Sequence, residues 1–164
     1  MNDSETSKKI RLRVGTRDEI PELRKLFRET VLNVNVRDYS QEEVEDWASC
    51  GGRPGRMEEL FEELHFIVAY GEEDGSTLGF ASIRSDGYLH SLFVHKDRQG
   101  EGIGTALLRQ AEEHAMEHGA KEIHSEVSIT ARPFFEGKGY VVELEQKARA
   151  NRLYLTNYRM RKIL

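Results

Sequence analysis

The stretch VHKDRQGEGIGTALLRQAEEHA, residues 94–115, constrains the fold more than any other part of this chain. It places Gly100, Gly102 and Gly104 between a strand-like segment that ends at Val94 and a segment with apolar residues at helical spacing. At such a junction the unpaired amides of the first helical turn point outward, with the positive end of the helix dipole behind them. Because glycine lets the backbone curl around an anion without a Cβ in the way, the stretch predicts a pyrophosphate-binding loop. A tight strand-to-helix turn without a ligand is the alternative.

Two other glycine loops fit this stretch badly. The dinucleotide fingerprint GxGxxG fails because Thr105 stands at its third glycine position, and the chain has no GK[ST] sequence for a P-loop. The loop therefore has to be of another kind.

Strand-like and helix-like patterns alternate along the rest of the chain. The sequence "SCGGRPGR" predicts a loop, and Ser40 with Glu43 forms a capping box that starts a helix. Three strands joined by short polar turns predict an antiparallel meander, and the helix after the glycines makes a βαβ crossover. The expected strands cover 10–14, 65–70, 77–84, 88–95, 121–129, 140–150 and 152–163, and the expected helices lie within 18–33, 40–48, 57–64, 102–118 and 131–139.

Length and composition narrow the class of protein. The 164 residues predict a single domain spanning 1–164, and the net charge of -5 disfavours an extended nucleic-acid surface. Cys50 is the single cysteine, so no internal disulfide forms. No apolar run approaches the ~18 residues of a membrane span, and the first ten residues lack the apolar stretch of a secretory signal. We expect a soluble, cytoplasmic protein that binds neither nucleic acid nor membrane.

Three blocks of the sequence resemble a known family. Gln99, Gly102 and Gly104 match the Q/RxxGxG/A motif of the GNAT superfamily of acyl-CoA N-acyltransferases. The block "SITARPFFEGKGY" at 128–140 looks like the GNAT segment that ends AxxFYxxxGF, and "NYRMRKIL" resembles its closing strand. With "YSQEEVEDWA", these blocks are similar in particular to the YafP-like branch of small bacterial GNAT proteins.

The resemblance implies an α/β (α+β) GNAT fold, a mixed, mostly antiparallel sheet of about seven strands with flanking helices and a V-shaped cleft for acetyl-CoA. In this reading the backbone of the strand ending at Val94 pairs with the pantetheine amides, and the loop amides hold the pyrophosphate. Ser128 stands where the family often has an Asn, and Glu101, which replaces a common basic residue, is expected to point to water. The implied cofactor-binding residues are Leu92, Phe93, Val94, Gln99, Gly100, Glu101, Gly102, Ile103, Gly104, Thr105, Ser128, Phe134 and Phe135. Core packing is the alternative for the two phenylalanines.

The implied reaction is attack of a primary amine, of a small molecule or peptide, directly on acetyl-CoA in a ternary complex. The amine must lose a proton, and His90 is the candidate base because an imidazole with a pKa near ~6.5 suits this task at neutral pH. Many relatives have a tyrosine as acid where this chain has Phe135, so water, Tyr39 or Tyr158 would replace it. Tyr39, Trp47 and Tyr158 are the candidate acceptor-site residues.

Two other functions stay open. A GNAT-fold protein that binds acyl-CoA without turnover is the main alternative, because Phe135 cannot donate a proton. The sequence "HAMEH" at 114–118 spells the inverted zincin pattern HxxEH, but it falls in the last turn of the crossover helix, so no metal is expected. The identity of the acceptor is not readable, and a homodimer is implied only by the habit of the family.

Overall fold

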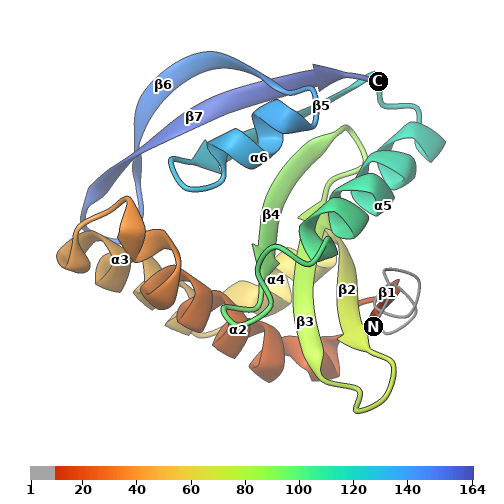
Figure 1. The fold of residues 1–164 in the computed structure, drawn as a ribbon, viewed down its shortest axis with the longest axis horizontal. Coiled ribbons are helices and arrows are strands. Elements are labelled where there is room, and N and C mark those ends of the chain that lie inside the picture. Colours follow the sequence, from red (N-terminus) through yellow and green to blue (C-terminus); the bar gives the residue numbers. More distant parts are fainter. Residues whose placement is uncertain (1–9) are drawn as a thin grey trace.

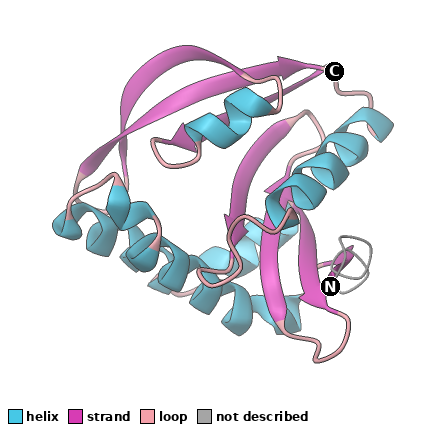
Figure 2. Cartoon of the chain, in the orientation of Figure 1, coloured by secondary structure: helices cyan, strands magenta, loops and turns pink. Residues whose placement is uncertain are grey.

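The structure is a computed structural model that describes residues 10–164. A seven-stranded mixed sheet runs in the order β1-β2-β3-β4-β5-β7-β6, with helices on both faces (Figures 1 and 2). The strands are β1 (Ile10–Val14), β2 (His65–Gly71), β3 (Thr77–Ile83), β4 (Tyr88–Val94), β5 (Glu122–Ser128), β6 (Val141–Arg149) and β7 (Tyr154–Ile163). The α-helices are α2 (Ile20–Asn33), α3 (Gln41–Ala48), α4 (Arg56–Glu63), α5 (Ile103–Glu117) and α6 (Arg132–Gly137). Short 3-10 helices are η1 (Arg17–Glu19), η2 (Asn35–Arg37) and η3 (Ser49–Gly52).

The sheet consists of two antiparallel halves joined by one short parallel contact. Strands β1 to β4 form a meander, and β5, β7 and β6 form the second half. Between the halves, β4 pairs with β5 only at Tyr88 with His124 and at Leu89 with Ser125. The Ser125 hydroxyl also donates to the Leu89 carbonyl over 2.7 Å. Beyond Leu89 the two strands separate, so the sheet opens as a V between them.

The helices cover opposite faces of the first half of the sheet. The apolar face of α5, including Leu107 and Ala111, packs in one core cluster with Ala81 and Leu89 of β3 and β4. On the other face, α2 and α4 pack against Phe66 and its neighbours. This alternation follows from the two-residue period of a strand, which sends successive side chains to opposite faces.

A buried carboxylate joins the two sides of the V at one end. Asp46 of α3, 5% exposed, accepts hydrogen bonds from the backbone amides of Asn151, Arg152 and Leu153 in the β6–β7 turn, the closest to each amide being 2.9 to 3.0 Å. Burial acts to raise the pKa of Asp46, but these three amides and the Arg152 charge keep it below its ordinary value. Figure 1 shows α3 beside this turn. This contact fixes the position of the β6–β7 hairpin relative to α3. The hairpin belongs to the second half of the sheet, so the contact also holds that wall of the V in place.

The fold expected from the resemblance is confirmed, including seven strands, flanking helices and the order of elements. The capping box is present, since the Ser40 hydroxyl accepts from the Glu43 amide over 3.1 Å and the Glu43 carboxylate accepts from the Ser40 amide over 2.9 Å. One local difference concerns the expected loop "SCGGRPGR", which contains the 3-10 turn η3 (Ser49–Gly52).

Candidate active site

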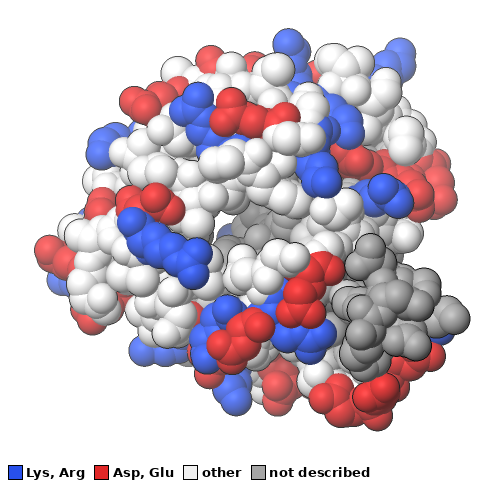
Figure 3. All heavy atoms as spheres, viewed as in Figure 1, with Lys and Arg blue, Asp and Glu red and all other residues white. Residues whose placement is uncertain are grey.

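One large cavity lies in the V of the sheet, with a volume of about 810 Å³. It extends from the glycine loop, past the separated parts of β4 and β5, to helices α2, α3 and α4. Figure 3 shows the molecule hollowed at its centre, with charged side chains gathered mainly around the rim. The cavity falls within the range of volumes usual for small-molecule sites.

The glycine loop presents backbone amides at one end of the cavity. Gly100 and Gly102 have φ angles of +74° and +84°, a left-handed conformation that only glycine adopts without strain. Gly102 is the N-cap of α5, so the amides of Ile103, Gly104 and Thr105 in its first turn have no partner within the helix. The arrangement is a helix N-terminus open to an anion.

The side chains of this loop serve the loop itself. Gln99 donates to the carbonyls of Val94 and His95 over 2.8 and 3.3 Å, which ties the loop to the end of β4. Glu101 is exposed and lies outside the cavity lining, where it accepts from Arg98 over 2.8 Å. Arg98 itself lines the cavity and brings a positive charge to the loop.

Gly104 faces the other wall of the V. A Cβ added there would lie 3.4 Å from the Phe134 ring and 3.6 Å from Val94, in ordinary contact. Both rings line the cavity, but Phe134 is half-buried there, whereas Phe135 is 3% exposed and packs edge-on against Phe134 and Tyr140 at 5.4 and 5.1 Å between ring centroids. Core packing, given as the alternative for the two phenylalanines, therefore describes Phe135 better than Phe134.

Main-chain groups of β4 face the open side of the V at alternate residues. The amide of His95 donates to Leu78 of β3 over 2.8 Å, so by the alternation of an antiparallel ladder Phe93 also directs its main chain to β3. Leu92 and Val94 direct theirs into the gap. The Val94 carbonyl is already bound by the Thr30 hydroxyl at 3.0 Å and by Gln99. Of the three residues expected to pair with pantetheine, Leu92 and Val94 direct main-chain groups into the gap, whereas Phe93 directs its main chain to β3. The expectation for the Phe93 backbone is therefore corrected: it pairs within the sheet.

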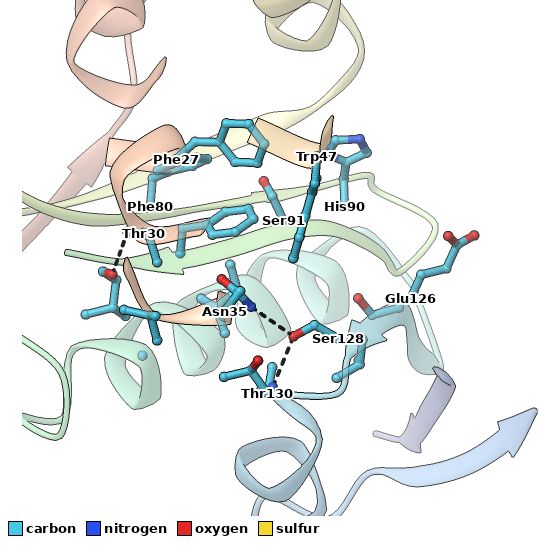
Figure 4. Close-up of a pocket in the computed structure, with 18 of the residues that line it drawn as sticks. Phe27, Thr30, Asn35, Trp47, Phe80, His90, Ser91, Glu126, Ser128 and Thr130 are labelled. Carbon is cyan, nitrogen blue, oxygen red and sulfur yellow. Dashed lines mark hydrogen bonds between the residues drawn. The ribbon is translucent and has the colours of Figure 1, made fainter. Parts of the chain in front are cut away.

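Ser128 lies on the opposite strand of the V. Its hydroxyl accepts from the amide of Ala131 over 3.0 Å and from the side-chain amide of Asn35 over 3.5 Å (Figure 4). Asn35 is buried and comes from η2, far away in the sequence. It therefore brings an amide side chain to the strand position where the family often carries an Asn.

His90 occupies a bulge at the point where β4 and β5 separate. Ser82 pairs with Ser91 and Ile83 with Leu89, so His90 is the extra residue of β4. Both His90 and Ser91 line the cavity (Figure 4). The bulge thus places two consecutive polar side chains on the cavity side, which regular strand alternation would not allow.

The imidazole of His90 is neutral over the physiological pH range. Burial and then the positive charge of Arg56 lower its pKa from 6.5 to about 4. Its Nδ1 atom is buried and has no hydrogen-bond partner among residues 10–164. The sequence predicts the ordinary imidazole pKa near 6.5 for His90. This expectation is corrected, because burial lowers the pKa of His90.

The three candidate acceptor-site residues have different positions. Trp47 lines the cavity, half-buried and edge-on to Tyr39 at 5.8 Å. Tyr39 also lines it, but its hydroxyl donates to the Thr156 carbonyl over 2.6 Å and accepts from the Ile129 amide over 2.9 Å. Burial is the main cause that raises the pKa of Tyr39 to about 12, so this residue is a poor proton donor. Tyr158 does not line the cavity, because its ring faces the core and lies under the Arg132 guanidinium at 4.5 Å.

Several lining residues carried no signal in the sequence. They come from helices, strands and loops that meet only in the fold, and no local pattern singles them out as site residues. Among them are Phe27, Thr30, Asn35, Arg56, Phe80, Arg98, Glu126 and Thr130.

The HxxEH pattern lies away from the cavity. His114 stacks on His65 at 3.8 Å between ring centroids, and the His118 ring lies tilted against it at 4.2 Å. None of the three lines the cavity, and burial lowers the pKa values of His65 and His114. Within residues 10–164, no group of three His, Cys, Asp or Glu side chains is arranged to hold a metal ion.

The fold and the cavity are those of an acyltransferase family. A family model described as an acetyltransferase (GNAT) domain matches residues 35–162. The chain belongs to the GNAT acetyltransferase family. No helix among residues 10–164 is long and apolar enough to cross a membrane.

Individual relatives agree with this assignment. The chain is 26% identical over 152 residues to the uncharacterized N-acetyltransferase YafP of Escherichia coli (strain K12), covering 93% of this chain and 95% of that protein. A GCN5-related N-acetyltransferase structure from Rhodopseudomonas palustris superposes with a TM-score of 0.89 and 26% identity, over 95% of this chain and 96% of that one. PaiA N-acetyltransferase from Thermoplasma acidophilum, solved in complex with coenzyme A, has the same fold with a TM-score of 0.76 and 18% identity, over 94% and 99% of the chains.

Proposed function

We propose that this protein transfers an acetyl group from acetyl-CoA to a primary amine by direct attack in a ternary complex. The observation that carries this proposal is the continuity of the cavity, since one space joins the amides of the glycine loop to the side chain of His90. A pyrophosphate at the loop and a thioester at the apex of the V are the two ends of one extended ligand. The amine acceptor then enters from the side of α2, α3 and α4.

Different residues of the chain bind different parts of this extended ligand. The first-turn amides of α5 and Arg98 hold the pyrophosphate, and the main chain of Leu92 with the Val94 amide pairs with the pantetheine arm. Ser128, Asn35 and Thr130 flank the arm on the other side of the V. The Thr130 hydroxyl is buried and has no hydrogen-bond partner within the described part of the chain. The site residues Gly100, Gly102, Ile103, Gly104 and Thr105 act through their backbone, whereas Glu101 only fixes Arg98.

His90 accepts the proton of the attacking amine, directly or through one water. As the nitrogen bonds to the carbonyl carbon its proton becomes strongly acidic, so a neutral imidazole of low basicity suffices at that stage. The coenzyme leaves as a thiolate, which is stable enough to depart unprotonated because the pKa of a thiol is about 8.5. No dedicated acid is required, and the structural roles of Tyr39 and Tyr158 agree with a reaction without one.

The first test is thermal stabilisation by acetyl-CoA. A ligand that binds only the native state at a hundred times its Kd stabilises it by about 2.7 kcal/mol, which is roughly 5–10 °C in Tm for a chain of this size. We expect acetyl-CoA to produce this shift, measured by differential scanning fluorimetry, and NAD or ATP to produce much less. Equal shifts with all three ligands, or none with acetyl-CoA, would contradict the proposal. An acyl-CoA binder without turnover would show the shift but no release of free CoA with any amine.

A second prediction isolates the glycine loop. Valine at position 102 is strained, because a β-branched residue cannot adopt a φ of +84° without cost, and nothing else within 4 Å opposes a Cβ there. The loop will therefore relax away from its anion-binding shape, and Gly102→Val should weaken acetyl-CoA binding at least tenfold, about 1.4 kcal/mol. Calorimetric titration measures this.

Gly55→Val is the matched control. Gly55 is also a left-handed helix N-cap, with a φ of +78° and no atom within 4 Å of an added Cβ, and it lies outside the cavity lining. It should cost similar stability while leaving acetyl-CoA affinity unchanged. If both variants bind acetyl-CoA like the original protein, the loop is a ligand-free turn.

A further inference from the structure

The acceptor end of the cavity has an apolar wall of aromatic rings. Phe27, Phe80 and Trp47 point into it (Figure 4), and Phe93 packs between them. The Phe93 ring lies 5.1 Å from Phe27, 5.7 Å from Phe80 and 6.2 Å from Trp47 between centroids. Phe27, Trp47 and Phe93 are only partly buried although they join core clusters. Their remaining surface is available to an apolar group of the acceptor.

A cation lines the same end of the cavity. Arg56, the first residue of α4, is 38% exposed at its side chain and has one ion pair among residues 10–164, at 3.6 Å from Glu59. That carboxylate is bound more closely by Arg53, at 2.9 Å. After burial, the Arg56 charge helps to lower the pKa of His90, and it partly offsets the rise that burial gives the pKa of Tyr88. The guanidinium is therefore free to bind an anion beside the proposed base.

A carboxylate also lines the cavity. Glu126 on β5 is exposed and, in Figure 4, lies on the same side of the labelled residues as His90. Burial raises the pKa of Tyr88, and the charge of Glu126 adds to this. Tyr88 is thus close to the positive charge of Arg56 and to the negative charge of Glu126. The apex of the V therefore carries charges of both signs.

We propose that the acceptor is a free α-amino acid with an aromatic or branched apolar side chain. The Arg56 guanidinium binds its carboxylate, Glu126 attracts its ammonium group, and the aromatic wall receives its side chain. This assignment of the acceptor rests on the proposed acetyltransferase function. It uses all three features of the acceptor end, whereas an apolar amine without a carboxylate would leave Arg56 with only its 3.6 Å ion pair to Glu59.

The reaction balances with these groups. The ammonium group first loses one proton to the solvent. The neutral amine then attacks the thioester carbonyl carbon, the N–C bond forms and the C–S bond breaks with its electron pair on sulfur. The second proton leaves the nitrogen through His90 and passes to the solvent or to the thiolate. The product is an N-acetyl amino acid, which no longer carries a positive charge for Glu126 to hold, so its release is favoured.

Matched pairs of acceptors test the proposal. Release of CoA from acetyl-CoA is measured with L-phenylalanine and L-leucine, with their decarboxylated counterparts phenethylamine and isopentylamine, and with glycine. We expect kcat/KM for each apolar amino acid to exceed that of its decarboxylated counterpart, and of glycine, tenfold or more. Arg56→Gln should remove the preference for the carboxylate by raising KM for the amino acids, so that the ratio of kcat/KM between each amino acid and its decarboxylated counterpart falls toward one.

Arg53→Gln is the control for Arg56. It removes a neighbouring guanidinium that shares Glu59 but does not line the cavity, so the preference should persist. If acetyl-CoA binds but the decarboxylated amines or glycine react as well as the apolar amino acids, or if Arg56→Gln leaves the preference unchanged, the amino-acid proposal is overturned and the proposed function stands. The proposal is likewise overturned if acetyl-CoA binds but none of these acceptors is acetylated. Failure of acetyl-CoA to bind at all overturns both.

Discussion

His90→Gln is expected to lower kcat about a hundredfold or more while leaving acetyl-CoA affinity near its original value. Loss of a positioned base typically costs 10²–10⁴ in rate. The glycine loop and the main chain of Leu92 and Val94, which we propose hold the cofactor, do not involve the His90 side chain and should be unaffected. Steady-state kinetics with an accepted amine and calorimetric titration of acetyl-CoA measure the two quantities separately.

The same substitution should change the pH dependence of stability. The pKa of His90 is about 4 in the folded protein, roughly 2.5 below its ordinary value of 6.5. The unfolded chain therefore binds the extra proton first, and the folded state loses stability as the pH falls from 6.5 to 4, by about 3 kcal/mol in total. His90→Gln should remove this part of the acid sensitivity, measured as the free energy of unfolding in urea at pH 7 and pH 4.5.

His124→Gln controls for a strand histidine without a catalytic role. His124 is half-buried on β5 and does not line the large cavity. The His124→Gln variant should keep the original kcat.

Because His90 is already deprotonated near neutral pH, activity between pH 6 and 8 should follow the free-amine fraction of the acceptor rather than a titration of the imidazole. A rate for His90→Gln equal to that of the original protein would show that another group, such as Glu126, takes the proton.

The part of the site that could be predicted from sequence is the part built from contiguous residues. The glycine loop, the strand before it and the helix after it are adjacent in the chain, so their residue types specify both conformation and chemistry. The position of His90 at the apex also followed from its distance along β4, but its bulge did not, because the bulge depends on pairing with β3.

The acceptor end could not be predicted in the same way. Arg56, Glu126 and Phe80 come from α4, β5 and β3, and only the tertiary structure brings them to one cavity. The lowered pKa of His90 likewise depends on burial and on Arg56, neither of which a local pattern encodes. Tyr158 was misplaced for a related reason, since its neighbour Asn157 lines the cavity while its own ring packs in the core.

The apex of the V depends on a glycine that the sequence indicated only as a turn residue. Gly87 ends the turn between β3 and β4 with a φ of +103°, and its carbonyl accepts from the His124 amide of β5 over 3.0 Å. A Cβ at this position would lie far inside van der Waals contact with the Glu122 carbonyl oxygen, which is backbone and cannot rotate away. The absence of a side chain at Gly87 is therefore what allows β5 to close onto β4 before the two strands separate.

Gly87→Ala is accordingly expected to destabilise the protein by about 4 kcal/mol or more, because left-handed strain of roughly 1–3 kcal/mol adds to a backbone collision. This corresponds to a loss of about 10 °C or more in Tm. Gly75→Ala provides the comparison, since Gly75 has a φ of +70° with nothing within 4 Å of an added Cβ and should lose only the strain term. Similar Tm losses for the two variants would mean that β5 can shift away from Gly87 without cost. In that case the width of the V would be adjustable, and acetyl-CoA affinity of the Gly87→Ala protein would remain near the original value instead of falling with the displaced strand.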